Sequence, residues 1–320
     1  MRLQRVSNEP ILSPREDIAF EKDAVLNAAA IYADDKFHLY YRAVAHNPGD
    51  RNRSCIGYAW SHDGVHFERM DTPLLATGER PEESKGLEDA RLTKIDDTYH
   101  LVYTAWNEKQ TEISRATSTD LIHWERQGIM FGYEQMGNNK NAALFPEKIN
   151  GEYALIHRPI GFGAFDDSGE KTPLDMWISF SPDLVHWHDH QVLMRTRRDE
   201  VPFEWWKIGT GGVPMKTDAG WLLVYHAVDY KRIYRLGLVL FDLNDPTKIL
   251  KRTDEPILEP ETEWELNGDV NNVVFTCGTV LRGTELWVYY GGADKYIGLA
   301  KGDVAEFLGV PAQQAALAGA

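Results

Sequence analysis

The segment that decides the fold is Ala116-Thr117-Ser118-Thr119-Asp120, followed by Ile122-His123-Trp124, because its pattern returns along the chain. A second copy is Trp177-Ile178-Ser179-Phe180-Ser181-Pro182-Asp183 with Val185-His186-Trp187, and a third is Ile56-Gly57-Tyr58-Ala59-Trp60-Ser61 with His62-Asp63-Gly64. Runs rich in Val, Ile, Tyr and Trp predict strands. The Ser-x-Asp turns supply side-chain oxygens that bond the nearby backbone and tighten a hairpin.

A further strand-like run precedes each copy, and two more units with the same order of strand-like runs follow. The preceding runs are 37–42, 99–103 and 153–157; the later units combine 221–226 with 236–242, and 286–290 with 297–300. A repeat of roughly 55–70 residues with several strands per unit is typical of propeller blades. We therefore predict an all-β protein, a five-bladed β-propeller, with one catalytic domain over residues 1–310. A β-sandwich is the alternative, and the five-fold recurrence argues against it.

The overall charge and the chain termini limit the partners. A net charge of −15 over 320 residues repels phosphate backbones and anionic lipid, so we expect neither nucleic acid nor membrane as a partner. The N-terminus lacks an apolar h-region and no long apolar run occurs, which predicts a cytoplasmic protein. Two cysteines, Cys55 and Cys277, are too few to predict a disulfide framework, although the sequence leaves open a single disulfide between them. Residues 311–320 are predicted to be helical or disordered, and a homo-oligomer is compatible with the sequence.

An acidic motif lies just before the strand-like run 99–103. The segment 86–92 places Glu88, Asp89 and Arg91 beside a glycine. A neighbouring arginine lowers the pKa of a carboxyl, whereas a general acid needs its pKa raised. From the residues alone, a structural salt bridge and a catalytic element are equally good interpretations of this motif.

Four basic residues occupy comparable places in successive units. They are Lys140, Arg158, Lys207 and His226. Corresponding strand ends converge in a propeller, so these residues could surround one anion, with the Tyr234 hydroxyl as a further donor. The sequence thus predicts a phosphate site in an acidic protein. In the alternative interpretation, each cation pairs with a nearby surface acid.

Polar residues also stand where strands should bury apolar ones. Asn27, Arg42 and Asp294 must therefore bond one another or hold the hydroxyl groups of a ligand, and sugar binding is the better interpretation for Asp294. No metal site or cofactor is expected. The histidines of 186–190 alternate along a strand, and the glycine-rich segment 209–212 lacks a surrounding βαβ unit.

Seven phrases in one order resemble glycoside hydrolase family 130, the β-mannoside phosphorylases and related β-mannosidases, from about Asn8 to about Gly302. They are Gly-Leu-Glu-Asp-Ala-Arg (86–91), Ala-Leu-Phe-Pro-Glu (143–147), His-Arg-Pro (157–159), Lys-Ile-Gly-x-Gly (207–211), Gly-Trp-Leu-Leu-Val-Tyr-His (220–226), Tyr-Arg-Leu-Gly (234–237) and Tyr-Tyr-Gly-Gly-Ala-Asp (289–294). The family is five-bladed. This sequence departs from the family's pattern at two positions: Ala90 stands where many members have proline, and Lys140 stands in place of an arginine.

The resemblance implies a role for each candidate residue. Asp89 is the general acid and protonates the glycosidic oxygen through the 3-hydroxyl of the mannosyl unit. The family's phosphate-binding positions fall on Lys140, Arg158, Lys207, His226 and Tyr234. Its contacts to the mannosyl ring fall on Asn27, Arg42 and Asp294.

The basic set decides between two reactions. An inverting hydrolase needs a second carboxylate that activates water, whereas inorganic phosphate is already a nucleophile and needs cations around it. We therefore predict phosphorolysis, with inversion, of a β-mannosidic bond in a manno-oligosaccharide, yielding α-mannose 1-phosphate. The alternatives are an inverting β-mannosidase, with Glu204 or another acid activating water, and a non-catalytic sugar-binding propeller. The sequence leaves the linkage, β-1,2 or β-1,4, open.

Overall fold

The computed structural model describes residues 1–47, 50–161 and 174–311, and their architecture is all-β. Helical structure is confined to short turns: η1 (Pro81–Glu83), α1 (Tyr133–Met136), η2 (Pro202–Glu204), α2 (Glu263–Leu266) and α3 (Ala305–Leu308). In these ranges no helix is long and apolar enough to cross a membrane. The all-β prediction is confirmed, whereas the predicted tail falls almost wholly on residues 312–320, which lie outside the described residues.

The strands form sheets in which consecutive strands pair antiparallel. Unit 1 contains β2 (Ala24–Ala33), β3 (Lys36–Asn47), β4 (Asp50–Ser61) and β5 (Glu68–Arg69). Unit 2 contains β6 (Gly86–Ile95), β7 (Thr98–Trp106), β8 (Thr111–Ser118) and β9 (Glu125–Phe131). Unit 3 contains β10 (Asn138–Leu144), β11 (Tyr153–Ile160), β12 (Met176–Ser181) and β13 (His188–Met194).

Unit 4 contains β14 (Lys207–Thr210), β15 (Met215–Thr217), β16 (Gly220–Val228), β17 (Tyr234–Phe241) and β18 (Ile249–Arg252). Unit 5 contains β19 (Val274–Arg282), β20 (Glu285–Gly292), β21 (Tyr296–Asp303) and the N-terminal β1 (Gln4–Arg5). Units 1 and 2 are joined into one eight-stranded sheet by a single parallel pair, Ser54 with Gly86.

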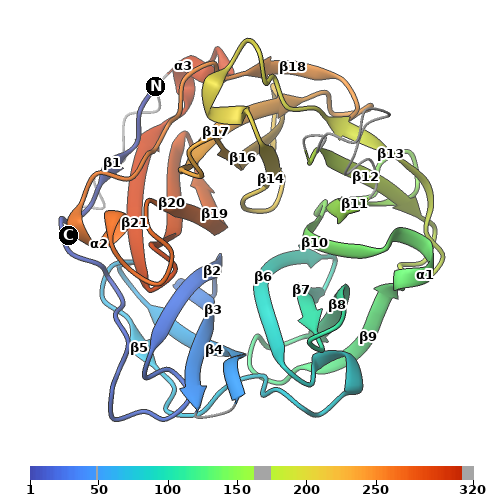
Figure 1. Ribbon diagram of the computed structural model, residues 1–320. Coiled ribbons are helices and arrows are strands. Elements are labelled where there is room, and N and C mark those ends of the chain that lie inside the picture. The colour runs from blue at the N-terminus through green and yellow to red at the C-terminus, as the bar shows by residue number, and fades with distance from the viewer. Residues whose placement is uncertain (48–49, 162–173, 312–320) are drawn as a thin grey trace.

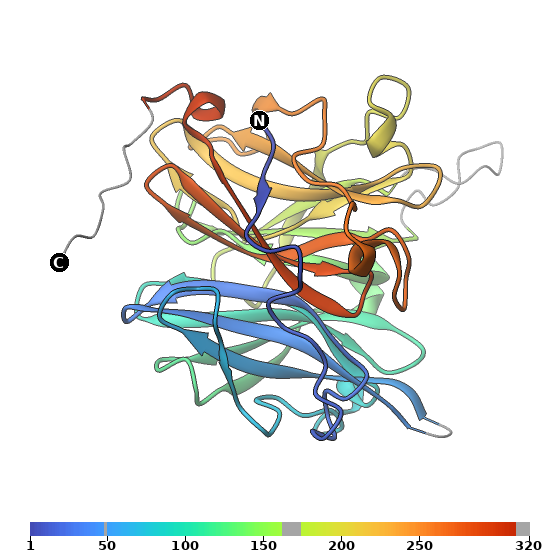
Figure 2. The same ribbon diagram turned by 90° about the vertical axis from the view of Figure 1, so that its left-hand side faces the viewer.

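The units are arranged around a common centre, with β2, β6, β10, β14 and β19 innermost (Figure 1). The strand from the N-terminus lies beside the last strand of the chain, since Gln4 and Arg5 pair with Lys301 and Ala300. Figure 2 shows the same sheets from the side, with units 1 and 2 below the others. The two ends of the chain thus meet in one sheet.

The hydrophobic core lies between neighbouring units. Each large buried cluster takes residues from two successive units: Tyr40 packs with Tyr103 between units 1 and 2, and Ile156 with Tyr225 between units 3 and 4. A cluster containing Phe37 and Trp287 joins unit 1 to unit 5. Every sheet is therefore covered on both faces, which stabilises the ring by burial of apolar surface.

The three Ser-x-Asp turns have the bonds that the sequence predicts. In the copy at 181–186, the Ser181 hydroxyl accepts from the amide of Leu184 at 2.9 Å, and Asp183 Oδ1 accepts from the amide of His186 at 2.8 Å. The imidazole of His186 bonds the second carboxylate oxygen at 2.7 Å. The same pattern recurs at 61–66 and 118–123. These turns are local structures, so their prediction from sequence is confirmed.

The innermost strands differ from the sequence prediction. The segment 86–92 does not precede the first strand of its unit but is itself that strand, β6. Its register slips between Glu88 and Arg91, and Asp89 has a φ of 52°. The same bulge interrupts β2 at Asn27 and β10 at Asn141, with φ values of 51° and 55°. A bulge breaks the period-2 alternation from which a strand is recognised, which explains the error.

A buried tyrosine–glutamate–arginine network recurs in four units. In unit 4, the Tyr225 hydroxyl donates to Glu204 at 2.6 Å, and both Arg197 and Arg252 pair with the same carboxylate, which is fully buried. The equivalent tyrosine–glutamate pairs are Tyr41–Glu21, Tyr103–Glu83 and Tyr290–Glu265. Since each glutamate joins a strand to a loop, these networks fix the loops against the sheets.

Replacing Glu204 by glutamine is expected to lower the free energy of unfolding by about 3–5 kcal/mol, because Arg197 and Arg252 lose a buried counter-charge. The measurement is urea unfolding. Glu147→Gln is the matched control: Glu147 pairs with Lys216 on the surface, so the change should stay within about 0.5 kcal/mol. Equal losses in the two variants would contradict the interpretation.

Candidate active site

The bulges in the inner strands bring Asp89 and Asn27 together. Nδ2 of Asn27 donates to Oδ1 of Asp89 at 2.8 Å, and Nη1 of Arg42 lies 3.6 Å from the same oxygen. The Asp89 side chain is 13% exposed. A carboxyl that keeps some exposure in an otherwise buried setting can reach a ligand, and it can exchange a proton with it.

Glu88 lies beside Asp89 and pairs with two predicted site residues. Its Oε1 accepts from Nη2 of Arg42 at 2.8 Å, and its Oε2 from Nζ of Lys140 at 2.9 Å. The alternative interpretation, in which a basic residue is paired with an acid, therefore holds for Lys140. Its acid, however, belongs to the site and is the neighbour of Asp89.

Arg91 does not form the salt bridge that the motif suggested. Its guanidinium donates to backbone carbonyls: that of Gly211 at 2.6 Å, that of Thr210 at 2.8 Å and that of Asp89 at 2.9 Å. Arg91 is 1% exposed. It ties β6 to the end of β14 across the centre, and it leaves the carboxyl of Asp89 to other partners.

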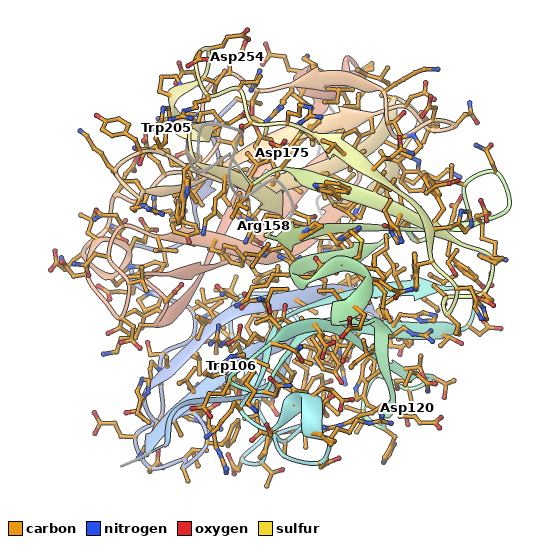
Figure 3. All side chains as sticks on the ribbon, turned by 45° about the vertical axis from the view of Figure 1, so that its right-hand side comes forward. Trp106, Asp120, Arg158, Asp175, Trp205 and Asp254 are labelled. Atoms are coloured by element: carbon orange, nitrogen blue, oxygen red, sulfur yellow. The ribbon has the colours of Figure 1, made fainter. Side chains whose placement is uncertain are left out.

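Arg158 and His226 form the buried part of the basic cluster. Nη1 of Arg158 lies 3.1 Å from Nε2 of His226, and the two side chains come from β11 and β16, each of which pairs with the innermost strand of its unit. In Figure 3 Arg158 lies near the centre of the view and Asp120 and Asp254 toward its edges, and Arg158 is 5% exposed. A Cβ on Gly209 would lie 2.5 Å from the imidazole, so only glycine admits this packing.

Lys207 and Tyr234 complete the cluster. Nζ of Lys207 donates to the Tyr234 hydroxyl at 2.6 Å. Burial, followed by the charges of Arg158, Lys140 and Arg232, lowers the pKa of Lys207 to about 6. Burial also lowers the pKa of His226 well below its ordinary value, and Arg158 adds to that effect. Both shifts disfavour the protonated form of a basic group that lies beside other basic groups, and an anion bound among them would favour that form.

Within the described ranges, no ion pair joins Arg158, Lys207 or His226 to an acidic residue. The described ranges therefore give no support to separate surface pairs for these three residues. Nε of Arg158 also has no hydrogen-bond partner in the described part of the protein. A buried donor without an acceptor is costly, which favours a ligand that supplies oxygen atoms here.

Asp294 stands on the acidic side of the site, in the turn between β20 and β21. Burial raises its pKa to about 6, while Arg42 opposes the shift and Asp89 and Asp269 increase it. Hydrogen bonds, ion pairs and electrostatic interactions connect the nine residues predicted from sequence: Asp89 acts on Arg158, and Asp294 acts on Lys207.

Two further residues act on groups of the site, although neither is among the nine predicted residues. Arg232 stacks on the ring of Trp206, 3.1 Å from its centroid, and its charge acts on Lys207. Asp269 lies 3.6 Å from His46 and acts on Asp294. The polar segment 268–273 was a signal for Asp269, whereas nothing in the local sequence distinguishes Arg232.

Other candidate residues from the sequence have structural partners or are buried in the core. His186 pairs with Asp183, His188 with Glu152, and His190 with the hydroxyl of Ser179. Trp187 is buried in the core, as expected for packing. Cys55 and Cys277 are both free, so the disulfide left open by the sequence is absent.

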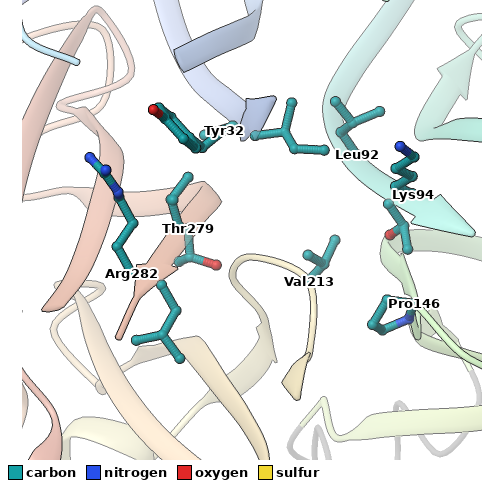
Figure 4. A pocket seen from close by; sticks show the side chains of 12 residues that line it. Tyr32, Leu92, Lys94, Pro146, Val213, Thr279 and Arg282 are labelled. Carbon is teal, nitrogen blue, oxygen red and sulfur yellow. The ribbon is translucent and has the colours of Figure 1, made fainter. Parts of the chain in front are cut away.

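A separate cavity of about 300 Å³ lies at the opposite ends of the inner strands (Figure 4). Tyr32, Leu92, Lys94 and Arg282 line it, and these residues follow the bulges in β2 and β6 or end β19. No acidic residue is among the described residues that line this cavity. It therefore lacks the proton donor that the Asp89 site offers.

Anion binding at the basic cluster is expected to take up a proton near pH 7.5. Free Lys207 is mostly neutral there because its pKa is about 6, and a bound anion raises that pKa; anion affinity therefore falls as the pH rises above 6. Titration calorimetry with sulfate in two buffers of different ionisation enthalpy measures the proton uptake. Sulfate is suitable because it does not titrate in this pH range. Lys207→Met should abolish it. Proton-neutral binding in the wild type would contradict the assignment.

Known proteins are similar to this chain over nearly its whole length. The family model described as beta-1,4-mannooligosaccharide phosphorylase matches residues 2–312. The beta-1,2-mannobiose phosphorylase of Thermoanaerobacter sp. (strain X514) is 45% identical over 311 residues, 93% of this chain and 96% of that protein. The 1,2-beta-oligomannan phosphorylase of the same organism is 43% identical over 308 residues, 94% and 97% of the two chains.

A solved structure is similar over the same extent. The beta-1,2-mannobiose phosphorylase from Listeria innocua, in complex with beta-1,2-mannobiose, superposes with a TM-score of 0.84 at 31% identity, covering 97% of this chain and 99% of that one. The match of the family model to nearly the whole chain, together with these relatives, shows that the protein belongs to glycoside hydrolase family 130.

Proposed function

We propose that this protein is an inverting glycoside phosphorylase that cleaves a β-mannosidic bond of a manno-oligosaccharide with inorganic phosphate and yields α-mannose 1-phosphate. The observation that carries the proposal is the cluster of Arg158, Lys207 and His226, which have no acidic partner in the described ranges and of which Arg158 lies within electrostatic range of Asp89. The relatives at 43% and 45% identity are named mannoside phosphorylases, which supports the same activity.

The fold that we propose is a five-bladed β-propeller formed by one domain over residues 1–310. Packing of unit 5 against unit 1 and pairing of β1 with β21 support it, because both features close a ring. In such a ring, the bulged inner strands present their polar residues to one mouth of the central channel.

On the acidic side, Asn27, Arg42 and Asp294 hold the hydroxyl groups of the mannosyl unit. Arg42 is fixed by Glu88 and lies near Asp89, so a sugar bonded to Arg42 is placed against the general acid. Asn27 orients the carboxyl through its bond to Oδ1. A sugar hydroxyl at Asp294 would find an acceptor whose pKa of about 6 leaves it mostly ionised at neutral pH.

On the basic side, Arg158, Lys207, His226 and Tyr234 bind phosphate, and Lys140 contributes from its pair with Glu88. These groups offset the repulsion between phosphate and an acidic protein, and they direct one phosphate oxygen at the anomeric carbon. As that oxygen bonds to the carbon from the α face, the β-glycosidic bond breaks. The proton of Asp89 passes through the 3-hydroxyl of the mannosyl unit to the departing oxygen.

Glu204, the base named for the hydrolytic alternative, is not available to a water molecule. Glu204 is fully buried and its carboxylate is taken by Arg197, Arg252 and Tyr225. It cannot activate water at the site. Phosphorolysis needs no second carboxylate, because phosphate arrives as a nucleophile.

We propose β-1,2-linked manno-oligosaccharides as substrates. The relatives at 43% and 45% identity are both named for β-1,2 linkages, whereas the family model is described by a β-1,4 linkage. Initial rates on β-1,2- and β-1,4-mannobiose with saturating phosphate separate the two, and faster turnover of the β-1,4 disaccharide would reject the β-1,2 assignment.

The central experiment follows product formation with and without phosphate. The protein is incubated with β-1,2-mannobiose, and proton NMR detects α-mannose 1-phosphate and free mannose. We expect the sugar phosphate to form as the α anomer, with negligible cleavage when phosphate is omitted. Equal release of mannose in both samples would reject phosphorolysis in favour of hydrolysis.

A further inference from the structure

Glu88 fixes Arg42 in the reaction scheme above, but its effect on phosphate binding is not yet assigned. Each of its carboxylate oxygens serves a different cation: Oε1 accepts from Arg42 at 2.8 Å and Oε2 from Lys140 at 2.9 Å. The side chain is 7% exposed. Arg42 belongs to the proposed sugar site and Lys140 to the proposed phosphate site. One buried carboxylate therefore connects the two halves of the site.

The bulge in β6 is the reason that Glu88 and Asp89 act side by side. Consecutive residues of a regular strand point to opposite faces of the sheet. Here the register slips after Glu88 and Asp89 has a positive φ, so both carboxylates approach the same guanidinium, that of Arg42. Glu88 is thereby placed next to the general acid without competing for its proton.

Electrostatics give Glu88 a second effect. Burial raises the pKa of Glu88, but Arg42 and Lys140 together hold it below its ordinary value, so the group is an anion at neutral pH. An anion in contact with Nζ of Lys140 competes with any phosphate that approaches the same ammonium group. The ion pair thus fixes Lys140 and reduces its attraction for the ground-state phosphate.

We propose that Glu88 is a positioning residue that holds Arg42 and Lys140 in the geometry needed for turnover and weakens ground-state phosphate binding by competing for Lys140. This inference rests on the proposed phosphorolysis. It assigns to Glu88 an effect on the phosphate KM that a purely structural ion pair would not have.

The test is the response of kcat and of the phosphate KM to Glu88→Gln. We expect kcat to fall about 10- to 100-fold, because two charge-assisted bonds are lost, and the phosphate KM to fall as Lys140 is freed. Titration calorimetry with inorganic phosphate alone should show the same tighter binding. An unchanged or higher phosphate KM and Kd would overturn the proposal.

A double-mutant cycle with Lys140→Met identifies the route of the effect. If Glu88 acts through Lys140, Glu88→Gln should leave phosphate affinity unchanged in the Lys140→Met background. Equal effects in both backgrounds would overturn the proposal. Glu88→Asp is the second variant: its shorter arm cannot reach both cations, so kcat should fall and the phosphate KM should again decrease, and failure of the KM to decrease counts against the inference.

Glu83→Gln is the matched control. Glu83 is a buried carboxylate of the same unit, paired with Arg126 and Tyr103 rather than with site residues. It should lower Tm and leave the phosphate KM unchanged. Two results separate failure of the proposed function from failure of this inference. Cleavage by the wild type without phosphate rejects the proposed function. Phosphate-dependent cleavage by the wild type, with an unaltered phosphate KM in Glu88→Gln, rejects only the role of Glu88.

Discussion

Asp89→Asn is expected to lower kcat by about 10²–10⁴, the usual contribution of a positioned general acid. The amide keeps the shape of the side chain and its oxygen still accepts from Nδ2 of Asn27, so the site should remain assembled. What is lost is the proton that the departing sugar oxygen needs. Initial rates on β-1,2-mannobiose with saturating phosphate measure the effect.

The leaving group provides the control for this prediction. A mannosyl fluoride with the β configuration departs without protonation, so Asp89→Asn should be impaired far less on the fluoride than on the disaccharide. Phosphate affinity, measured by calorimetry, should change little. Similar losses on both substrates would show that the variant damages the site rather than removing an acid. Asp120→Asn, in a surface turn, should keep full activity.

Arg158→Met is expected to raise the phosphate KM and to lower kcat/KM for phosphate by about 10²–10³, the scale seen when one preorganised donor to a developing anion is removed. Arg158 is buried, contacts His226 and has no acidic partner in the described ranges, so its charge is available to an anion. Kinetics with varied phosphate at saturating disaccharide measure this effect. The disaccharide KM should change much less.

Arg115→Met is the control for Arg158→Met. Arg115 lies on β8, the third strand of its unit, and its Nη1 lies 3.1 Å from Nδ1 of His100. This arginine–histidine contact is similar to that of Arg158 with Nε2 of His226. Its loss should lower stability without changing the phosphate KM. A comparable rise of the phosphate KM in both variants would mean that the effect reports general damage and not anion binding.

The repeat, the strands and the Ser-x-Asp turns were predictable because they depend on residues close in sequence. Asp183, for example, bonds the amides of Val185 and His186, so its turn forms from local groups. The basic residues could be assigned to one site because equivalent positions of successive units meet at the centre. Residues from different units, such as Arg158 and His226, accordingly lie in contact.

Only the tertiary structure decided how the charges pair. Glu88, Asp89 and Arg91 stand together in sequence, yet Arg91 bonds the carbonyls of Gly211 and Thr210, and Glu88 bonds Arg42 and Lys140 from other units. Glu204 likewise became a buried counter-ion rather than a base. Spacing along the chain fixes which side chains share a strand. The partner of a buried charge depends on which strands the bulges and the packing of the sheets bring within about 3 Å, and those strands can be far apart in sequence, as Arg91 and Gly211 are.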